Sequence, residues 1–217
     1  MRTNAIIFDL DGTLIDSFQD IFLALRGSAV ALGLPIPNEK DIRGRMHLRL
    51  DDLVKTTFPE ADVNAVVRKF RDIYDSSGYP HTCLYPDVMR TIEALRSTKH
   101  QMFVATNKRK KATEAIMNRL GLEGAFELVV SSDISDPPLS KSELVRLVMN
   151  EGGLQASRTV MVGDAIGDWN AATENGLPFI LAEYGYGNIP HGEVHDGNVW
   201  AISSFKELIE VLRIEGH

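Results

Sequence analysis

The sequence predicts an α/β protein with a doubly wound, mainly parallel sheet into which a helical segment is inserted. Two observations lead to this fold class. Short apolar runs bounded by Gly, Asp or Asn alternate along the chain with helical patterns, and such alternation is typical of a parallel sheet covered by helices. The alternation is interrupted once, between about residues 16 and 84, where three helical patterns follow one another and no credible strand intervenes.

Short apolar runs supply the predicted strands of the sheet. Their continuous apolar character favours strands buried on both faces, as in a Rossmann-like sheet. The predicted strands are Ala5–Phe8, Met102–Ala105, Glu127–Val130, Thr159–Val162, Pro178–Leu181 and Val199–Ile202.

Apolar residues at helical spacing lie between these runs and after the last of them. They predict helices around residues 88–95, 112–120 and 144–149 and a final helix around residues 205–212. The chain therefore keeps returning to the same edge of the sheet at the end of each strand.

The inserted segment contains the clearest helical stripe of the chain, which runs from Val63 to Tyr74. We expect residues 1–15 and 85–217 to form the catalytic core and residues 16–84 to form a helical cap. Both ends of the segment leave and re-enter next to the first strand, so we expect the cap over the carboxyl end of that strand. Open parallel sheets bind their ligands at this end.

Composition limits the classes of partner. With 23 basic and 30 acidic residues the formal charge is -7, which argues against non-specific binding of nucleic acid or an anionic membrane. Cys83 is the single cysteine and excludes an internal disulfide, and no apolar stretch is long enough to span a bilayer. We therefore expect a small-molecule partner and a cytoplasmic location; the oligomeric state cannot be read from the sequence.

Polar residues gather where the predicted strands end. In "FDLDGTL" Asp9 and Asp11 follow the first strand, and if that strand continues, both carboxylates face the same side. Thr106 and Asn107 follow the second strand, and "GDAIGD" places Asp164 and Asp168 after the fourth. Four carboxylates at one edge repel one another unless a cation offsets their charge. A hard divalent ion such as Mg²⁺, which prefers oxygen ligands, would do so.

These residues resemble the motifs of the haloacid dehalogenase (HAD) superfamily. Its first motif, Asp-x-Asp-x-Thr, corresponds to Asp9-Leu-Asp11-Gly-Thr13, "VATN" to the second, Lys141 to the third and "VGDAIGD" to the fourth. The helical insertion, "YPDVMRTIEALR" and "EYGYGN" are similar to the phosphoglycolate phosphatase and β-phosphoglucomutase branch. The third motif departs from the usual Lys-Pro order, because in "SDPPLSKSELVRL" the prolines precede the lysine.

The resemblance implies phosphoryl transfer through an aspartyl-phosphate. Asp9 would be the nucleophile, Asp11 the general acid and base, and Thr106 and Lys141 would complete the catalytic set. The implied Mg²⁺ ligands are Asp9, Asp11, Asp164 and Asp168, and the implied phosphate or substrate contacts are Gly12, Thr13, Thr106, Asn107, Lys108 and Arg45.

Several residues have a plain structural alternative. Thr106 could cap the following helix, and Asp168 could be a first-turn acid favoured by the helix dipole. Arg45 lies in the cap stretch "IRGRMHLRLDD", which could be a surface helix with ordinary ion pairs. Tyr184 and Tyr186 are expected to be packing or loop residues.

The sequence favours a phosphatase of a small phosphorylated metabolite. Asp11 argues against dehalogenases and phosphonate-cleaving relatives, which lack the second Asp, and "SFQDIF" lacks the cap histidine of the phosphomutases. The alternatives are a sugar-phosphate mutase or pyrophosphatase of the same branch, a non-catalytic protein that binds a phosphorylated ligand, or a phosphoacceptor signalling domain, whose short chain would leave the insertion unexplained.

Overall fold

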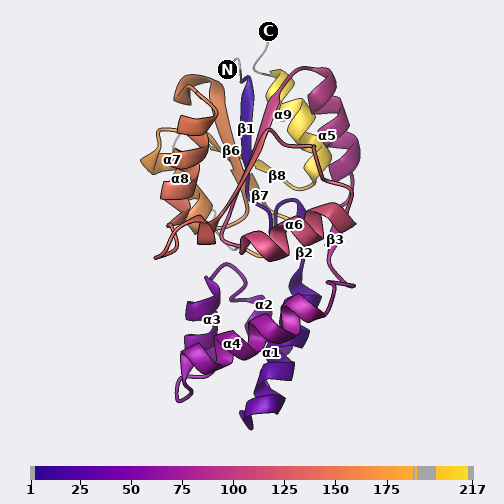
Figure 1. The fold of residues 1–217 in the computed structure, drawn as a ribbon. Helices are drawn as coiled ribbons and strands as arrows, with labels where there is room; N and C mark the ends of the chain where they lie inside the picture. The colour runs from indigo at the N-terminus through magenta and orange to yellow at the C-terminus, as the bar shows by residue number, and fades with distance from the viewer. Residues whose placement is uncertain (1–2, 188, 190–198, 215–217) are drawn as a thin grey trace. The chain divides into compact units, whose positions relative to one another are not determined.

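The computed structural model describes residues 3–187, 189 and 199–214 of the chain. The chain divides into two compact units (Figure 1). The sheet unit is formed by Met1–Ile15 and Leu84–His217, and the helical unit by Asp16–Cys83. Each unit is described separately below.

A six-stranded sheet forms the centre of the sheet unit within the described residues, with β1 among its central strands. The strand order is β5-β4-β1-β6-β7-β8, and all of the pairs are parallel. In the register, Ile7 of β1 lies beside Phe103 on one side and Met161 on the other. The strands are β1 (Ala5–Phe8), β4 (Gln101–Thr106), β5 (Leu128–Ser131), β6 (Thr159–Gly163), β7 (Phe179–Ala182) and β8 (Val199–Ile202).

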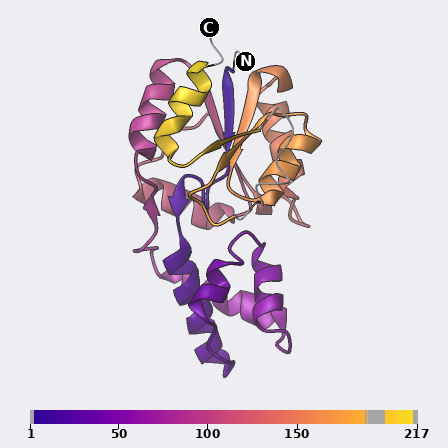
Figure 2. The ribbon, with the colours of Figure 1, turned by 180° about the vertical axis from the view of Figure 1, so that it is seen from behind.

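The predicted doubly wound α/β fold is confirmed. Helices α7 and α8 lie on one face of the sheet and α5 and α9 on the other (Figures 1 and 2), and α6 packs beside β5. The helices are α5 (Val88–Ser97), α6 (Lys110–Arg119), α7 (Lys141–Glu151), α8 (Ile166–Glu174) and α9 (Leu208–Ile214), with short 3-10 turns η1 (Ser132–Ile134), η2 (Ala156–Arg158) and η3 (Phe205–Glu207).

Burial on both faces explains why the strands are continuously apolar. Ile6, Ile7 and Phe8 of β1 are fully buried. On the face covered by α7 and α8, Ile7 belongs to a core that also contains Leu144 and Val148 from α7. A charged side chain cannot be accommodated along these strands without loss of this apolar burial, so polar residues occur where the strands end.

The helical unit contains four helices, one more than the sequence patterns predict. Helix α1 packs on α4, and α4 packs on α3. The additional helix, α2, has five residues and is capped by the side chain of Asn38, so it is too short to show an apolar period. The helices are α1 (Phe18–Leu32), α2 (Glu39–Arg43), α3 (Leu50–Thr57) and α4 (Val63–Ser76).

Two short strands that the sequence does not reveal lie where the chain passes between the units. They are β2 (Ile15–Asp16) and β3 (Cys83–Leu84), which pair with each other. The expectation that no strand occurs between Asp16 and Leu84 is therefore wrong at its two ends, because two residues are too few to show alternation. Within the described residues, no helix combines the length and apolar character needed to cross a bilayer.

Candidate active site

The parallel sheet brings three strand ends of the sheet unit to one edge. Strand β1 ends at Phe8, and its neighbours β4 and β6 end at Thr106 and Gly163. Asp9 and Asp164 are the next residues along β1 and β6, so their side chains leave the sheet at its carboxyl edge, where open parallel sheets bind ligands.

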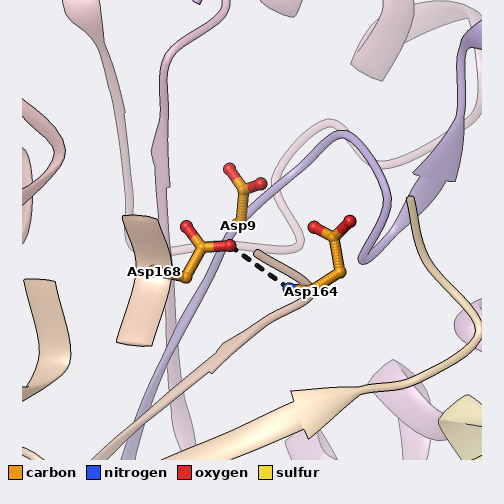
Figure 3. Close-up of side chains that lie close together, drawn as sticks. All are labelled: Asp9, Asp164 and Asp168. Atoms are coloured by element: carbon orange, nitrogen blue, oxygen red, sulfur yellow. Dashed lines mark hydrogen bonds between the residues drawn. The ribbon is translucent and has the colours of Figure 1, made fainter. Parts of the chain in front are cut away.

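Three buried carboxylates meet at this edge (Figure 3). Asp9, Asp164 and Asp168 each offer one oxygen, and these oxygens lie within 4.8 Å of one another. Their residues keep only 8%, 2% and 1% of their exposure. Among the described residues they form a group able to hold one metal ion, and three of the four predicted metal ligands are thus brought together.

Lys141 is the cation of this cluster. It begins α7, where Ser140 and Glu143 form a capping box that fixes the start of the helix. Its Nζ lies 2.5 Å from Asp9 Oδ1 and 2.9 Å from Asp168 Oδ1, and it also donates to the Ala105 carbonyl at 3.0 Å. Lys141 is the first residue of α7, although the prolines precede it in the sequence.

Three carboxylates facing one ammonium group leave a surplus of negative charge. Burial raises the pKa of Asp9 well above its ordinary value, and Asp168 and Asp164 add to this rise, although Lys141 opposes it. Burial, followed by the charge of Asp168, raises the pKa of Asp164 to about 7. For Lys141 burial acts downward, but the charges of Asp168 and Asp9 outweigh it and raise the pKa of the lysine.

A divalent cation fits this donor set. Two negative charges remain if all three carboxylates are ionised beside one lysine, and burial makes that surplus unfavourable without a counter-charge. The donors are all oxygens, as Mg²⁺ prefers. Asp9, Asp164 and Asp168 could therefore hold such an ion.

Asp168 lies in the first turn of α8 and also belongs to the carboxylate group. Its Oδ2 accepts hydrogen bonds from the amides of Asp164 and Ala165 at 3.2 and 3.1 Å, which caps α8 and fixes the loop after β6. Its other oxygen, Oδ1, pairs with Lys141. The first-turn acid is therefore also a member of the carboxylate group.

Asp11 lies outside the group of three carboxylates. Because β1 ends at Phe8, strand alternation does not extend to Asp11, which instead forms an isolated bridge with Ile15 in the following turn. Its Oδ1 lies 3.0 Å from Nζ of Lys108. That Asp11 is a metal ligand and that Lys108 contacts the substrate both stay predictions.

Five of the six predicted phosphate or substrate contacts lie at the end of β4 or in the loops after β1 and β4. The Gly12 amide donates to the Ile15 carbonyl at 2.9 Å, and Thr13 Oγ1 lies 3.5 Å from Asp164 Oδ1. Gly12 has φ +84°, and a Cβ there would lie 2.3 Å from Asp164 Oδ2, so both its conformation and its proximity to Asp164 require glycine.

Thr106 is buried, and its Oγ1 accepts from the Lys108 amide at 3.1 Å. It does not cap α6, which begins at Lys110, so the alternative of a helix cap is wrong. The Asn107 carbonyl accepts from Ser132 Oγ at 2.8 Å, which ties this loop to the end of β5. Contact of Thr106 and Asn107 with phosphate stays a prediction.

Arg45 belongs to the helical unit, in the turn between α2 and α3. Its amide donates to the Ile42 carbonyl and its carbonyl accepts from the Leu48 amide, each at 2.9 Å. Arg45 is thus part of a turn rather than of a regular surface helix, so that alternative is wrong. A role in substrate binding stays a prediction.

The sequence does not reveal the donors that hold Asp164. The amides of Tyr186 and Gly187 donate to its Oδ2 at 2.8 and 2.9 Å. The Tyr184 hydroxyl donates to the Thr13 carbonyl at 2.9 Å, and burial, with Tyr85 and Asp164 nearby, raises the pKa of this tyrosine. The alternating glycines of "YGYG" are the sequence signal for such a close backbone approach.

Known proteins are similar to this chain along most of its length. Residues 6–182 match the family model for haloacid dehalogenase-like hydrolases. The chain is 34% identical over 185 residues to a phosphoglycolate phosphatase of Aquifex aeolicus, with 83% of this chain and 85% of the relative covered. It is 31% identical over 221 residues to a phosphoglycolate phosphatase of Vibrio parahaemolyticus, with 96% of both chains covered.

A solved structure has the same fold. It is a hydrolase of the haloacid dehalogenase-like family from Streptococcus pneumoniae, which superposes with a TM-score of 0.87 at 25% identity and covers 99% of both chains. The chain belongs to the haloacid dehalogenase-like hydrolase family. Within that family it is a HAD-like phosphatase, so the predicted family and enzyme class are confirmed.

Proposed function

We propose that the protein is a Mg²⁺-dependent phosphatase that hydrolyses a small phosphomonoester through an aspartyl-phosphate on Asp9. The observation that carries this proposal is the position of Asp9, whose carboxylate follows the central strand β1 and lies against Lys141 within the buried carboxylate group. A protein that only bound a phosphorylated ligand would not need a nucleophile, a separate acid and a cation in such an arrangement.

In the first half of the proposed reaction an oxygen of Asp9 attacks phosphorus. The bond from phosphorus to the ester oxygen breaks, and Asp11 protonates the departing alcohol. Asp11 pairs with Lys108 rather than Lys141 and lies outside the group that contains Asp9, which supports separate roles for the two carboxylates.

In the second half a water molecule attacks the phosphorus of the aspartyl-phosphate. Asp11, now ionised, removes a proton from that water, inorganic phosphate leaves, and the Asp9 carboxylate is restored. Throughout both steps Lys141 remains positively charged beside Asp9 and offsets the negative charge of the phosphoryl group.

The proposed ligands of Mg²⁺ are Asp9, Asp164 and Asp168, together with Asp11 as predicted from the sequence. When bound, the ion would offset the negative charge of the carboxylates and of the phosphate. The proposed phosphate contacts lie at the same sheet edge; they are Thr106 at the end of β4 and Asn107, Gly12 and Thr13 in the loops that follow β4 and β1.

Phosphoglycolate is the proposed substrate. This choice rests on the two relatives described above, which are named phosphoglycolate phosphatase and match most of the chain. The formal charge of -7 disfavours a polyanionic macromolecule and is compatible with a small phosphorylated metabolite.

The direct test is a screen of the purified protein against phosphate esters with Mg²⁺ present, including phosphoglycolate, sugar phosphates, nucleotides, pyrophosphate and p-nitrophenyl phosphate. We expect kcat/KM to be highest for phosphoglycolate, with activity lost in EDTA and restored by excess Mg²⁺. Full activity in chelator would contradict the metal site. Conversion of a sugar phosphate to its isomer without phosphate release would favour a mutase.

A further inference from the structure

We propose that the segment Tyr184–Gly187, after β7, is a positioning element that orients Asp164 for cation binding. The proposal rests on the proposed Mg²⁺ site and adds to it residues that act through Asp164. Three observations on this segment support it. Two backbone amides donate to Asp164, two glycines allow the backbone to approach it, and a tyrosine hydroxyl joins the segment to the loop after β1.

The amides of Tyr186 and Gly187 converge on a single oxygen of Asp164. Both donate to Oδ2, at 2.8 and 2.9 Å, so the two lone pairs of that oxygen are occupied. The carboxylate cannot rotate without breaking both bonds. Oδ1 is therefore the oxygen that remains for a cation, and its direction is set by the backbone of this segment.

The two glycines allow the segment to approach Asp164 this closely. A Cβ on Gly185 would lie 2.3 Å from the Asp164 Cβ and 2.4 Å from the Gly12 carbonyl oxygen. A Cβ on Gly187 would lie 1.8 Å from the Asp164 carbonyl oxygen. All three distances are shorter than any real contact, so the small space between the segment and Asp164 requires glycine at both positions.

The Tyr184 hydroxyl joins this segment to the loop that carries the first motif. It donates to the Thr13 carbonyl at 2.9 Å, and its ring packs edge-on against Tyr85 with centroids 4.8 Å apart. Thr13 Oγ1 in turn faces Asp164 Oδ1 at 3.5 Å. The loops after β1, β6 and β7 are thus held together around one carboxylate, as outer partners of metal ligands commonly are.

Binding of Mg²⁺ to the full chain, measured by isothermal titration calorimetry, separates positioning from simple packing. Tyr184→Phe removes one hydroxyl, and Gly185→Ala inserts a methyl group against Asp164. Gly167→Ala is the matched control, because a Cβ at this helical glycine of the fourth motif meets nothing within 4 Å. The melting temperature of each protein in EDTA reports on the fold without the metal.

We expect the Mg²⁺ dissociation constant to rise about 3- to 10-fold in Tyr184→Phe and about 10- to 100-fold in Gly185→Ala. Gly167→Ala should stay within about twofold of the wild type. If Gly185→Ala does not fold, Tyr184→Phe decides, because loss of one hydroxyl leaves the ring packing intact. If the variants melt at a lower temperature in EDTA but keep the wild-type dissociation constant for Mg²⁺, the segment contributes only to packing and the proposal is wrong.

The wild-type titration distinguishes this proposal from the proposed function. If the wild-type protein binds Mg²⁺ and both variants bind it equally well, the positioning role alone is wrong. If the wild-type protein shows no Mg²⁺ binding, the metal site and the positioning role are both wrong.

Discussion

Lys108 and Asp11 form an ion pair, with Lys108 Nζ 3.0 Å from Asp11 Oδ1, and the two side chains keep only 6% and 23% of their exposure. Asp9, two residues earlier, pairs instead with Lys141. Each carboxylate of the first motif therefore has its own lysine, Lys108 from the loop after β4 and Lys141 from the start of α7. This separation predicts that replacement of Lys108 and replacement of Lys141 have different effects on activity and stability.

Replacement of Lys108 by Met should lower kcat more than it changes KM. The substitution keeps the apolar stem but removes the charge that orients Asp11, and misplacement of a catalytic group by about 1 Å costs on the order of 100-fold in rate. We expect a fall in kcat of about 10- to 100-fold, measured by steady-state kinetics with phosphoglycolate. Because Asp11 is also one of the proposed ligands of Mg²⁺, we expect the dissociation constant for the ion to rise as well.

Lys110→Met is the control for this change. Lys110 lies in the same run of cations, but its side chain is 71% exposed and pairs with Glu114 on the surface of α6. Its replacement should leave kcat and KM unchanged. If Lys108→Met instead raises KM at constant kcat, Lys108 binds the substrate directly, as the sequence predicts, and the orienting role is wrong.

Replacement of Lys141 by Met should affect both activity and stability. Lys141 pairs with Asp9 and Asp168 at a site where its own side chain is 9% exposed, and removing one partner of a buried ion pair costs about 3–5 kcal/mol. We expect urea unfolding in EDTA to show a loss of this size, and kcat to fall by about 100-fold or more. A near-wild-type rate would show that the catalytic cation lies elsewhere.

The stability of the metal-free protein should fall as pH rises. The pKa of Asp164 is raised to about 7 and that of Asp9 is also raised, chiefly by burial. Between about pH 4 and 7 Asp164 keeps its proton in the folded state but has lost it in the unfolded state, and Asp9 shifts in the same direction. The folded state therefore binds more protons in this window, and the free energy of unfolding decreases as pH rises through it.

Urea unfolding at pH 5 and pH 8 in EDTA measures this effect, which should be on the order of a few kcal/mol. Saturating Mg²⁺ should reduce the loss, because the cation stabilises the ionised carboxylates. His100, whose pKa is lowered by burial, acts in the opposite direction in both the wild type and the variant. Comparison with Asp164→Asn therefore isolates the contribution of Asp164, and this variant should lose part of the pH dependence. An Asp164→Asn protein with the full wild-type dependence would contradict the assignment.

The sequence predicts the sheet well because parallel strands buried on both faces leave a clear apolar signal. The runs at residues 5–8 and 199–202 match β1 and β8 in full, whereas the run predicted at 127–130 is shifted by one residue from β5. Helix α2 and the two-residue strands β2 and β3 escape prediction because they are shorter than the periods that reveal secondary structure.

The candidate site is predictable where it depends on strand ends and unpredictable where it depends on backbone contacts. Asp9, Asp164 and Asp168 follow strands or begin a helix, so chain position alone brings them near one edge. The partner of Asp11 depends on the path of two loops, which one sequence does not define. The glycines of "YGYG" indicate a close backbone approach but do not identify its partner, and the amides of Tyr186 and Gly187 carry no further signal because every residue except proline has the same donor.

Asp9→Asn and Asp11→Asn should block different halves of the proposed reaction. Asp9→Asn removes the nucleophile, so neither a phospho-enzyme nor free phosphate should form. Asp11→Asn keeps the nucleophile, and esters with good leaving groups should still phosphorylate Asp9. Hydrolysis would then lack a general base, so the aspartyl-phosphate should accumulate.

Rapid quench with p-nitrophenyl phosphate, followed by mass spectrometry of the intact protein and its peptides, measures this difference. We expect a covalent phosphate on Asp9 in the Asp11→Asn protein and none in the Asp9→Asn protein. Both variants should keep their fold in EDTA, since each substitution replaces a carboxylate with an amide of the same shape. A covalent phosphate on any other residue, or equal turnover in the two variants, would overturn the assignment of Asp9 as nucleophile and Asp11 as acid and base.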